Sequence, residues 1–214
     1  MVNRTLLAMA ARVILLTLLI SITLPLYTMA QRSGLGLKGG ILGSLTRSAL
    51  LRYDPVLGGT AGLYLALHGG PRFELQPELL VTLQGSSHKA PENDLRRMDR
   101  QVYLQLPVSA KLFVSNAFNL HLGGQMGWLL LVGTITAEGS RDSRSDFVPL
   151  DAGIVVGMGL DLRTGTDLTL RYYSGLTPIL VGDSTVFPHN NTLQFTAGYR
   201  FLRMGAADHG RRRS

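Results

Sequence analysis

The sequence predicts an all-β protein, an eight-stranded antiparallel up-and-down transmembrane β-barrel. Three observations support this fold class: strands with one apolar and one glycine-rich polar face, connections that alternate between short and long, and an N-terminal export segment. The chain has 214 residues, enough for one full-sized domain. Only 16% of the residues are charged, where a soluble domain usually carries about 25%, so little of the chain is suited to face water.

The first 30 residues have the organisation of a secretory signal peptide. Arg4 and Arg12 precede an apolar stretch of about 12 residues that begins at Val13 and ends near Pro25, and small residues around Ala30 indicate a cleavage point. The alternative is an uncleaved helical anchor, although the stretch is shorter than the roughly 20 residues of a spanning helix. In both cases the body of the chain is expected to leave the cytoplasm, with residues 31–202 forming the barrel.

Eight segments alternate between apolar and polar residues, which is typical of strands because successive side chains point to opposite faces. In Asp151–Leu162, for example, Ile154 and Val156 share one face, and Asp151 and Asp161 share the other. Several segments are near the ~9–11 residues that cross a bilayer at a tilt. The predicted strands are, in order, Gly34–Leu42, Thr60–His68, Arg72–Gln84, Gln101–Ser115, Ala117–Val132, Leu150–Arg163, Thr166–Leu176 and Asn191–Phe201.

The connections between these strands alternate in length. Gly, Asn and Pro, which favour tight turns, occur in three short ones at His68–Arg72, Ser115–Ala117 and Arg163–Thr166. The other four are long and polar or mixed, at Gly43–Gly59, Gly85–Arg100, Gly133–Pro149 and Thr177–Asn190. Barrels of bacterial outer membranes have short periplasmic turns and longer external loops, so this alternation favours a membrane barrel.

The polar face of the strands is expected to line the lumen. It consists mostly of Gly, Thr, Gln, Asn and Ser, whereas a water-facing surface is normally dense in Lys and Glu. A soluble lipocalin-like barrel with an apolar cavity also alternates and is the alternative. Because buried charges must be paired, we expect ion pairs and hydrogen bonds to plug the lumen. The predicted lumen cluster is Lys38, Glu74, Glu78, Lys111, His121, Asp151, Asp161, Arg171 and Arg200.

The apolar face is expected to contact lipid. Aromatic rings with both apolar and polar character favour the boundary between lipid and water. Phe73, Tyr199 and Phe201 are expected near the periplasmic boundary, and Trp128 near the outer boundary.

No enzymatic, cofactor or metal site is predicted. The chain has no cysteine, which excludes disulfides and cysteine-based metal sites. His121 has Asn119 and Gly123 two residues away on its strand, so no Ser or acid is adjacent to serve as a catalytic partner. Gly157-Met-Gly159 lies inside a strand with no helix after it, unlike a nucleotide-binding motif. The net charge of +7 is concentrated at the two termini, so nucleic acid is not an expected partner.

Short motifs follow one another in a recognisable order along the body of the chain: Gly36–Gly40, Phe73–Leu80, Tyr103–Val108, Leu122–Gly127, Gly157–Leu160, Leu170–Thr177, and the aromatic end Tyr199–Phe201. In this order they resemble the outer-membrane β-barrel family typified by PorT-like proteins of Bacteroidetes. The resemblance covers essentially the whole mature chain. It implies a barrel in the outer membrane of a Gram-negative bacterium, with the lipid bilayer and the barrel-assembly machinery as partners. Founding members of the family are tied to protein secretion.

The expected function is a structural or interaction role, exerted through the outer loops or the periplasmic side of a barrel with a plugged polar lumen. An accessory role in protein secretion is what the resemblance implies, and the sequence names no protein partner. Two alternatives stay open: a narrow porin-like channel, and a soluble periplasmic barrel that binds lipophilic ligands. Residues 203–214 are expected to form a disordered basic tail, with a periplasmic tether to acidic partners or to peptidoglycan as the alternative.

Overall fold

The structure is a computed structural model. It describes residues 32–47, 53–89, 96–136, 139–142, 144, 147–179 and 189–205. The signal peptide expected at residues 1–30, and residues 206–214 of the expected tail, lie outside the described residues. Within the described part of the chain, no helix is long and apolar enough to cross a membrane.

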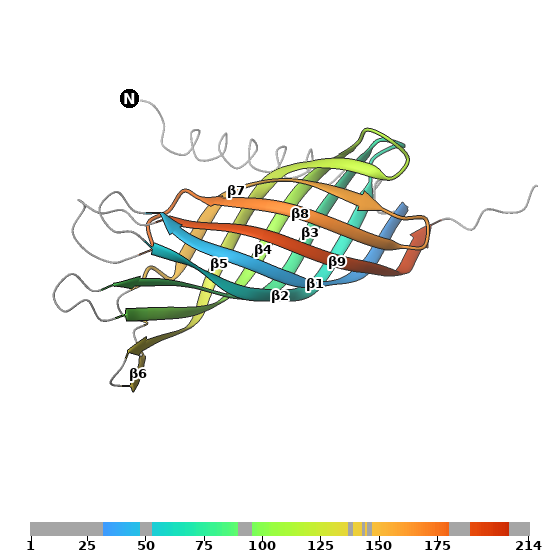
Figure 1. Cartoon of the computed structure of the whole chain (residues 1–214). Helices are drawn as coiled ribbons and strands as arrows, with labels where there is room; N and C mark the ends of the chain where they lie inside the picture. Colours follow the sequence, from blue (N-terminus) through green and yellow to red (C-terminus); the bar gives the residue numbers. More distant parts are fainter. Residues whose placement is uncertain are drawn as a thin grey trace, which may run out of the picture.

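Eight long strands form a closed antiparallel ring (Figure 1). Each strand pairs with its neighbours in chain order, and the ring closes where the first strand pairs with the last. A short additional strand, β6, pairs only with the end of β5. The bounds are β1 Arg32–Arg47, β2 Tyr53–His68, β3 Phe73–Lys89, β4 Arg96–Phe113, β5 Phe118–Thr136, β6 Gly139–Asp142, β7 Leu150–Asp161, β8 Thr166–Gly175 and β9 His189–Gly205. The predicted fold class is therefore confirmed.

The strands extend further at one end of the barrel than their hydropathy predicts. β1 continues to Arg47 and β2 begins at Tyr53, so most of the connection expected at Gly43–Gly59 is strand. The inward positions there are occupied by small polar residues such as Ser44 and, on β3, Ser86, which are buried. A strand pair that projects beyond the bilayer needs no apolar outer face, and hydropathy therefore does not distinguish it from a loop.

The C-terminal end of the barrel also differs from the expected boundary. β9 continues to Gly205, so Arg203 belongs to the last strand and not to a tail that begins at residue 203. Its Nη2 donates a hydrogen bond of 3.1 Å to the carbonyl oxygen of Arg163, in the turn between β7 and β8. This contact ties the last strand to the neighbouring turn.

The strand register has irregularities in three pairs, between Pro55 and Gly59 on β2 and at β-bulges on β5 and β9, and the last two shift the alternation of inward and outward residues. On β5, Leu130 is skipped between the paired residues Leu129 and Leu131, so Leu130 and Leu131 both face outward. On β9, Phe201 is skipped in the same way and faces outward together with Leu202. One extra residue reverses which side chains face the lumen, and neither bulge has a signature in the hydropathy pattern.

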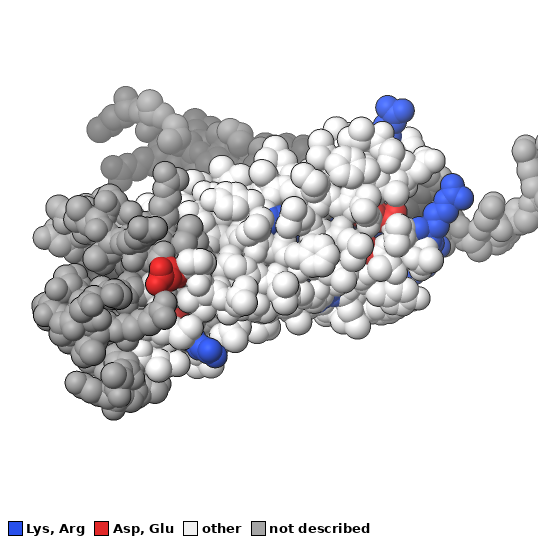
Figure 2. Space-filling view, viewed as in Figure 1, with Lys and Arg blue, Asp and Glu red and all other residues white. Residues whose placement is uncertain are grey.

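The outer wall of the ring is apolar. Figure 2 shows, from one side, a broad band of the wall almost free of charged side chains, with Lys, Arg, Asp and Glu mainly toward the two ends. A continuous apolar surface of this size would be unfavourable in water and suits lipid. Outward-facing residues of the band include Leu37, Ile41, Leu63, Leu79, Val108, Leu122, Met126, Ile154, Val156, Met158, Leu170, Leu193 and Phe195.

The aromatic residues expected at the lipid boundaries lie on the outer wall. Phe73 begins β3 directly after a short turn, and Tyr199 pairs with Thr166 at the start of β8, so both are near the short-turn end together with Phe201. Trp128 pairs with Leu150 toward the other end. All four aromatic side chains are exposed.

Candidate functional site in the barrel lumen

The inside of the barrel is filled with polar side chains, which excludes the apolar cavity that a soluble lipocalin-like barrel would need. Eight charged residues form a network there, with acids and bases equal in number, and Nε2 of His68 lies 3.1 Å from Oε2 of Glu74 at its edge. Seven of them belong to the predicted lumen cluster, and Asp167 is the eighth. The acids are Glu74, Glu78, Asp161 and Asp167, and the bases are Lys38, Lys111, Arg171 and Arg200.

The centre of this network is Glu78 on β3. Arg171 on β8 donates two hydrogen bonds to its carboxylate, 3.0 Å from Nη1 to Oε2 and 2.6 Å from Nη2 to Oε1. The Nζ of Lys38 on β1 lies 3.1 Å from Oε1 of Glu78 and 3.6 Å from Oδ1 of Asp167. In the ring, three strands separate β3 from β8 on either side, so the paired Glu78 and Arg171 side chains join opposite walls of the lumen.

A second group of ion pairs lies nearer the short turns. Glu74 on β3 is 3.2 Å from Arg200 and 3.7 Å from Lys111. Asp161 on β7 is 3.3 Å from Lys111 and 3.5 Å from Arg200, and it accepts a hydrogen bond of 2.9 Å from Nδ2 of Asn119. Two acids and two bases thus alternate around the lumen, and each charge has two opposite charges beside it.

Asp151 is separate from the ion pairs. It lies at the outer end of the lumen and accepts hydrogen bonds from Oη of Tyr173 at 2.9 Å, Oγ1 of Thr177 at 3.1 Å and Nδ2 of Asn190 at 2.9 Å. The sequence predicted its inward position, but Thr177 and Asn190 fell at the ends of a predicted loop.

An apolar cluster, called here the apolar plug, lies inside the barrel beside Asp151. It consists of Tyr103, Leu129, Val132 and Phe147, all buried. Backbone hydrogen bonds hold the segment that carries Phe147, from the Val148 amide to the Ile179 carbonyl at 2.9 Å and from the Leu129 amide to the Pro149 carbonyl at 2.8 Å. This plug was not predicted, because Phe147 lies within an expected loop. The apolar run Phe-Val-Pro at residues 147–149 is the signal in the sequence that points to it.

His121 lies inside the lumen with 4% of its surface exposed, and neither ring nitrogen has a hydrogen-bond partner among the described residues. Buried polar atoms of this kind cost about 1–3 kcal/mol when they stay unpaired, and ordered water usually pairs with them. The lumen between the ion pairs is therefore chemically suited to water. Other side chains with such atoms include Gln84, Gln101, Ser109, Gln125, Thr169 and Gln194.

Glycine on the inner face makes room for the large polar side chains of this narrow barrel. A Cβ on Gly159 would lie 2.8 Å from Nε2 of His121 and 2.9 Å from Oδ1 of Asn119. A Cβ on Gly36 would overlap the ring of Tyr64 on the adjacent strand. The glycine-rich character of the polar face thus follows from the space that its neighbours occupy.

Replacing Gly159 with Ala is expected to destabilise the barrel by about 1–3 kcal/mol, because the methyl group forces His121 and Asn119 out of their positions. Gly43→Ala is the matched control, since a Cβ there meets no atom within 4 Å. Urea unfolding in detergent micelles measures both changes. Equal effects of the two substitutions would contradict the crowding on the inner face.

The polar groups of the lumen form ion pairs with one another or are suited to bind water. Within the described residues no group of three or more His, Asp or Glu side chains is placed to hold a metal ion. The ion pairs engage the carboxylates in contacts with bases, and His121 has no carboxylate or hydroxyl group bonded to it among the described residues.

Solved structures with a similar fold include three small outer-membrane proteins. Neisserial surface protein A is 12% identical, with a TM-score of 0.50 over 79% of this chain and 99% of that one. Ail of Yersinia pestis is 14% identical, with a TM-score of 0.46 over 78% of this chain and 99% of that one. OprG of Pseudomonas aeruginosa is 11% identical, with a TM-score of 0.44 over 79% and 98% of the two chains. At these identities the likeness concerns the fold alone.

No curated protein matches the chain by sequence. The model of one family, described as outer membrane protein beta-barrel domain, matches residues 29–181, which is most of the chain and includes all of the long strands except β9. The apolar outer wall, the polar interior and the closed ring are the properties that an outer-membrane location requires. The chain therefore belongs to this family of outer-membrane β-barrels.

Proposed function

We propose that this protein has a structural or interaction role in the outer membrane, and that its lumen is sealed. The observation that carries the proposal is the pair of Glu78 and Arg171, which joins opposite walls of the ring. Lys38 is bound to the same carboxylate and to Asp167, so opening the lumen at this level requires separating several buried charges at once. The function is then exerted by surfaces, at the outer connections or on the periplasmic side.

A second barrier lies in series with the first. Tyr103, Leu129, Val132 and Phe147 pack together inside the outer end of the barrel, with Tyr103 and Leu129 fully buried. The apolar side chains replace part of the water that an ion needs at this level, and Asp151 is a charged group beside them. An ionic barrier and an apolar one together favour an interaction role over transport.

Purified protein in planar lipid bilayers is therefore expected to show no stable open-channel steps. The physical reason is that both barriers need side chains to separate from well-paired positions before ions can pass. A porin of known conductance, reconstituted in the same membranes, is the positive control. Large and stable steps from this protein would overturn the sealed lumen.

One observation favours a second candidate, a narrow porin-like channel. Several buried polar atoms of the lumen lack partners among the described residues, including those of Gln84 and His121, and suit a hydrated path. Swelling of liposomes in small uncharged solutes distinguishes the two candidates. Swelling without ionic conductance would assign the barrel to passage of small neutral molecules.

The resemblance to PorT-like proteins supports a finer form of the main proposal, in which the interaction partner belongs to a protein-secretion system. Cross-linking in native membranes, followed by identification of the neighbours, tests this form. Deleting the gene is expected to reduce the secreted proteins of the cell while leaving other outer-membrane proteins in place. An unchanged set of secreted proteins would remove the secretion role but leave the sealed barrel standing.

The export segment and the assembly partner belong to the same proposal. Cleavage after Ala30 would give a mature protein that begins at Gln31, and mass spectrometry of the N-terminal peptide from outer membranes detects it. The barrel-assembly machinery is the partner expected during biogenesis, and its depletion should lower the amount of folded barrel.

A further inference from the structure

The exposed charges at the short-turn end of the barrel are positive throughout the part of the chain that the structure describes. Arg72, Arg163 and Arg203 are exposed there, on turns and strand ends around the mouth of the lumen. Figure 2 shows Lys and Arg side chains projecting from this end. The described carboxylates of the same end are held in ion pairs inside the barrel and belong to Glu74, Asp161 and Asp167. The mouth therefore complements an anionic ligand.

The arginines lie on opposite sides of this mouth. Arg72 belongs to the turn between β2 and β3, and Arg163 to the turn between β7 and β8, so two strands of the ring separate the turns in either direction. Nη2 of Arg203 donates a hydrogen bond of 3.1 Å to the carbonyl oxygen of Arg163, which places both residues on one side. A small anion can contact one side at a time. An extended ligand that carries several anionic groups can contact both.

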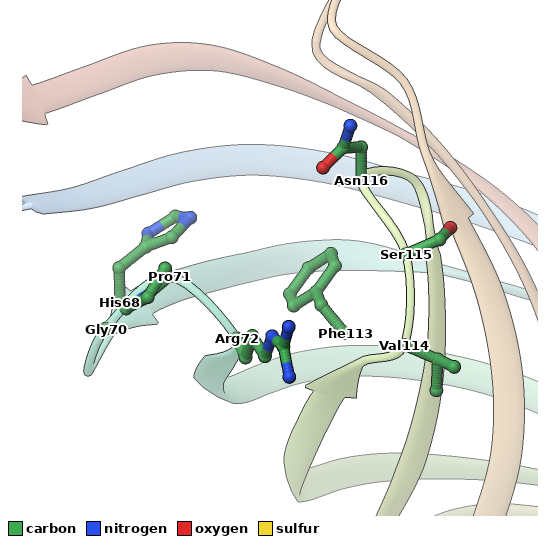
Figure 3. A pocket seen from close by; sticks show the side chains of 8 residues that line it. All are labelled: His68, Gly70, Pro71, Arg72, Phe113, Val114, Ser115 and Asn116. Atoms are coloured by element: carbon green, nitrogen blue, oxygen red, sulfur yellow. The ribbon is translucent and has the colours of Figure 1, made fainter.

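A hollow of about 350 Å³ lies at the same end, between the turn that joins β2 to β3 and the turn that joins β4 to β5 (Figure 3). Hydrogen bonds fix its two sides, since the amide of Phe113 donates to the carbonyl oxygen of Arg72 at 2.9 Å and the Ser115 hydroxyl oxygen accepts from the amide of Phe118 at 3.0 Å. The hollow is thus preformed by the strand ends. Its lining residues are His68, Gly70, Pro71, Arg72, Phe113, Val114, Ser115 and Asn116.

The lining combines a charge, an amide and an aromatic ring. Arg72 and Asn116 are exposed and come from one turn each, and Figure 3 shows the Phe113 ring between them in this view. The imidazole of His68 contacts the lumen network, with Nε2 3.1 Å from Oε2 of Glu74. An aromatic face attracts the polarised C–H groups of a sugar, an amide hydrogen-bonds to its hydroxyl groups, and arginine binds a carboxylate with two parallel hydrogen bonds. The hollow therefore suits a sugar that is linked to a carboxylate.

Two other anionic partners fit this end less well. A phospholipid stands beside the outer wall and does not extend across the mouth, so it cannot join the arginines of opposite turns. A protein interface usually has a central cluster of large aromatic or aliphatic side chains. The tips of the three short turns consist instead of Gly, Pro, Ser, Asn, Thr and Arg, at residues 69–72, 115–116 and 163–165.

We propose that the short-turn end of the barrel binds peptidoglycan, the anionic sugar polymer of the periplasm. Arg72 on one side, and Arg163 with Arg203 on the other, bind carboxylates of its stem peptides, and a sugar occupies the hollow against Phe113. In outer-membrane barrels the short turns face the periplasm, where this polymer lies. The site rests on the proposed interaction role, for which it names a surface and a partner, and it does not require a sealed lumen.

Co-sedimentation of the folded, detergent-solubilised barrel with isolated peptidoglycan sacculi tests this surface. The wild type is expected to sediment with the sacculi, and amidation of the polymer's carboxylates should remove most of the binding. Arg72→Gln and Arg163→Gln are each expected to weaken binding about threefold, within the range of an exposed ion pair. The double variant should weaken it about tenfold, because the two residues lie on opposite sides and act independently. Arg100→Gln, exposed at the opposite end of the barrel, should leave binding unchanged. Phe113→Ala should weaken binding to sacculi but not to polyglutamate.

Each of the other outcomes would overturn the proposal. If the folded wild type does not sediment, or if the double variant binds as well as the wild type, the mouth is not a peptidoglycan surface. A loss that occurs only when Arg211, Arg212 and Arg213 are replaced with Gln assigns the binding to the C-terminal arginines of the sequence. If anionic lipid vesicles or polyglutamate displace the barrel as effectively as soluble peptidoglycan fragments do, the surface takes a membrane or an acidic protein.

Heat-modifiable migration on gels verifies that each variant is folded. A negative result would leave the interaction role to the outer connections, and bilayer conductance tests the sealed lumen separately.

Discussion

Glu78→Gln is expected to destabilise the barrel by about 3–5 kcal/mol, because it removes the negative charge that pairs with two buried cations. Arg171 loses the carboxylate that accepts two of its hydrogen bonds, and Lys38 keeps Asp167, at 3.6 Å, as an opposite charge. Urea unfolding in detergent micelles or vesicles, followed by the fluorescence of Trp128, measures the loss. The surface substitution Arg100→Gln is the control and should change stability by about 0.5 kcal/mol or less.

A double-mutant cycle separates the ion pair from other effects of the substitution. Arg171→Gln should be costly in the wild type and much less so in the Glu78→Gln background, with a coupling energy of about 1 kcal/mol or more. A loss below about 1 kcal/mol for Glu78→Gln alone would mean that water screens this carboxylate well. The pair would then not seal the lumen.

Val156→Arg is expected to destabilise the barrel in lipid vesicles by about 2–4 kcal/mol, the cost of a cation on the lipid face at the bilayer midplane. Val156 faces outward midway along β7, where it pairs with Leu122 and Tyr172. Its neighbour in sequence, Val155, faces the lumen and is fully buried. Equilibrium unfolding in vesicles of thin bilayers measures the change.

Leu162→Arg is the matched control for depth. Leu162 is exposed directly after the end of β7, at the short-turn boundary, where an arginine reaches water and should cost about 0–1 kcal/mol. Equal costs at residues 156 and 162 would contradict the position of the apolar band in the membrane. Heat-modifiable migration shows whether each variant still folds.

Alternation alone was enough to predict all eight long strands, because a barrel in lipid needs opposite chemistry on its two faces. The same contrast identified the inward residues that carry the ion pairs, such as Glu78 and Arg171. Their partnership was not predictable, since these two residues are 93 positions apart and meet only through the tilt and stagger of the ring. The alternation predicts whether a residue faces the lumen or the lipid. It does not predict which residues on opposite strands lie at the same level of the barrel.

The features that sequence reasoning missed share one physical cause, which is that they break the simple alternation. The bulge at Leu130 reverses the phase of β5, so Leu129 enters the lumen as part of the apolar plug. Phe147 reaches the same plug from a segment that hydropathy assigns to a loop. Each of these positions is determined by tertiary packing and not by the local pattern.

The pairing of β1 with β9 has a consequence for how the protein enters the membrane. Until the last strand is in place, β1 and β8 each present a row of unpaired backbone groups, and hydrocarbon offers them no hydrogen-bond partners. A sheet of seven strands is therefore unstable in the bilayer. The free energy of insertion does not accumulate strand by strand but becomes favourable when the ring closes. The 17 residues of β9 complete insertion, and the timing of this event depends on the arrival of the C-terminal end of the described chain.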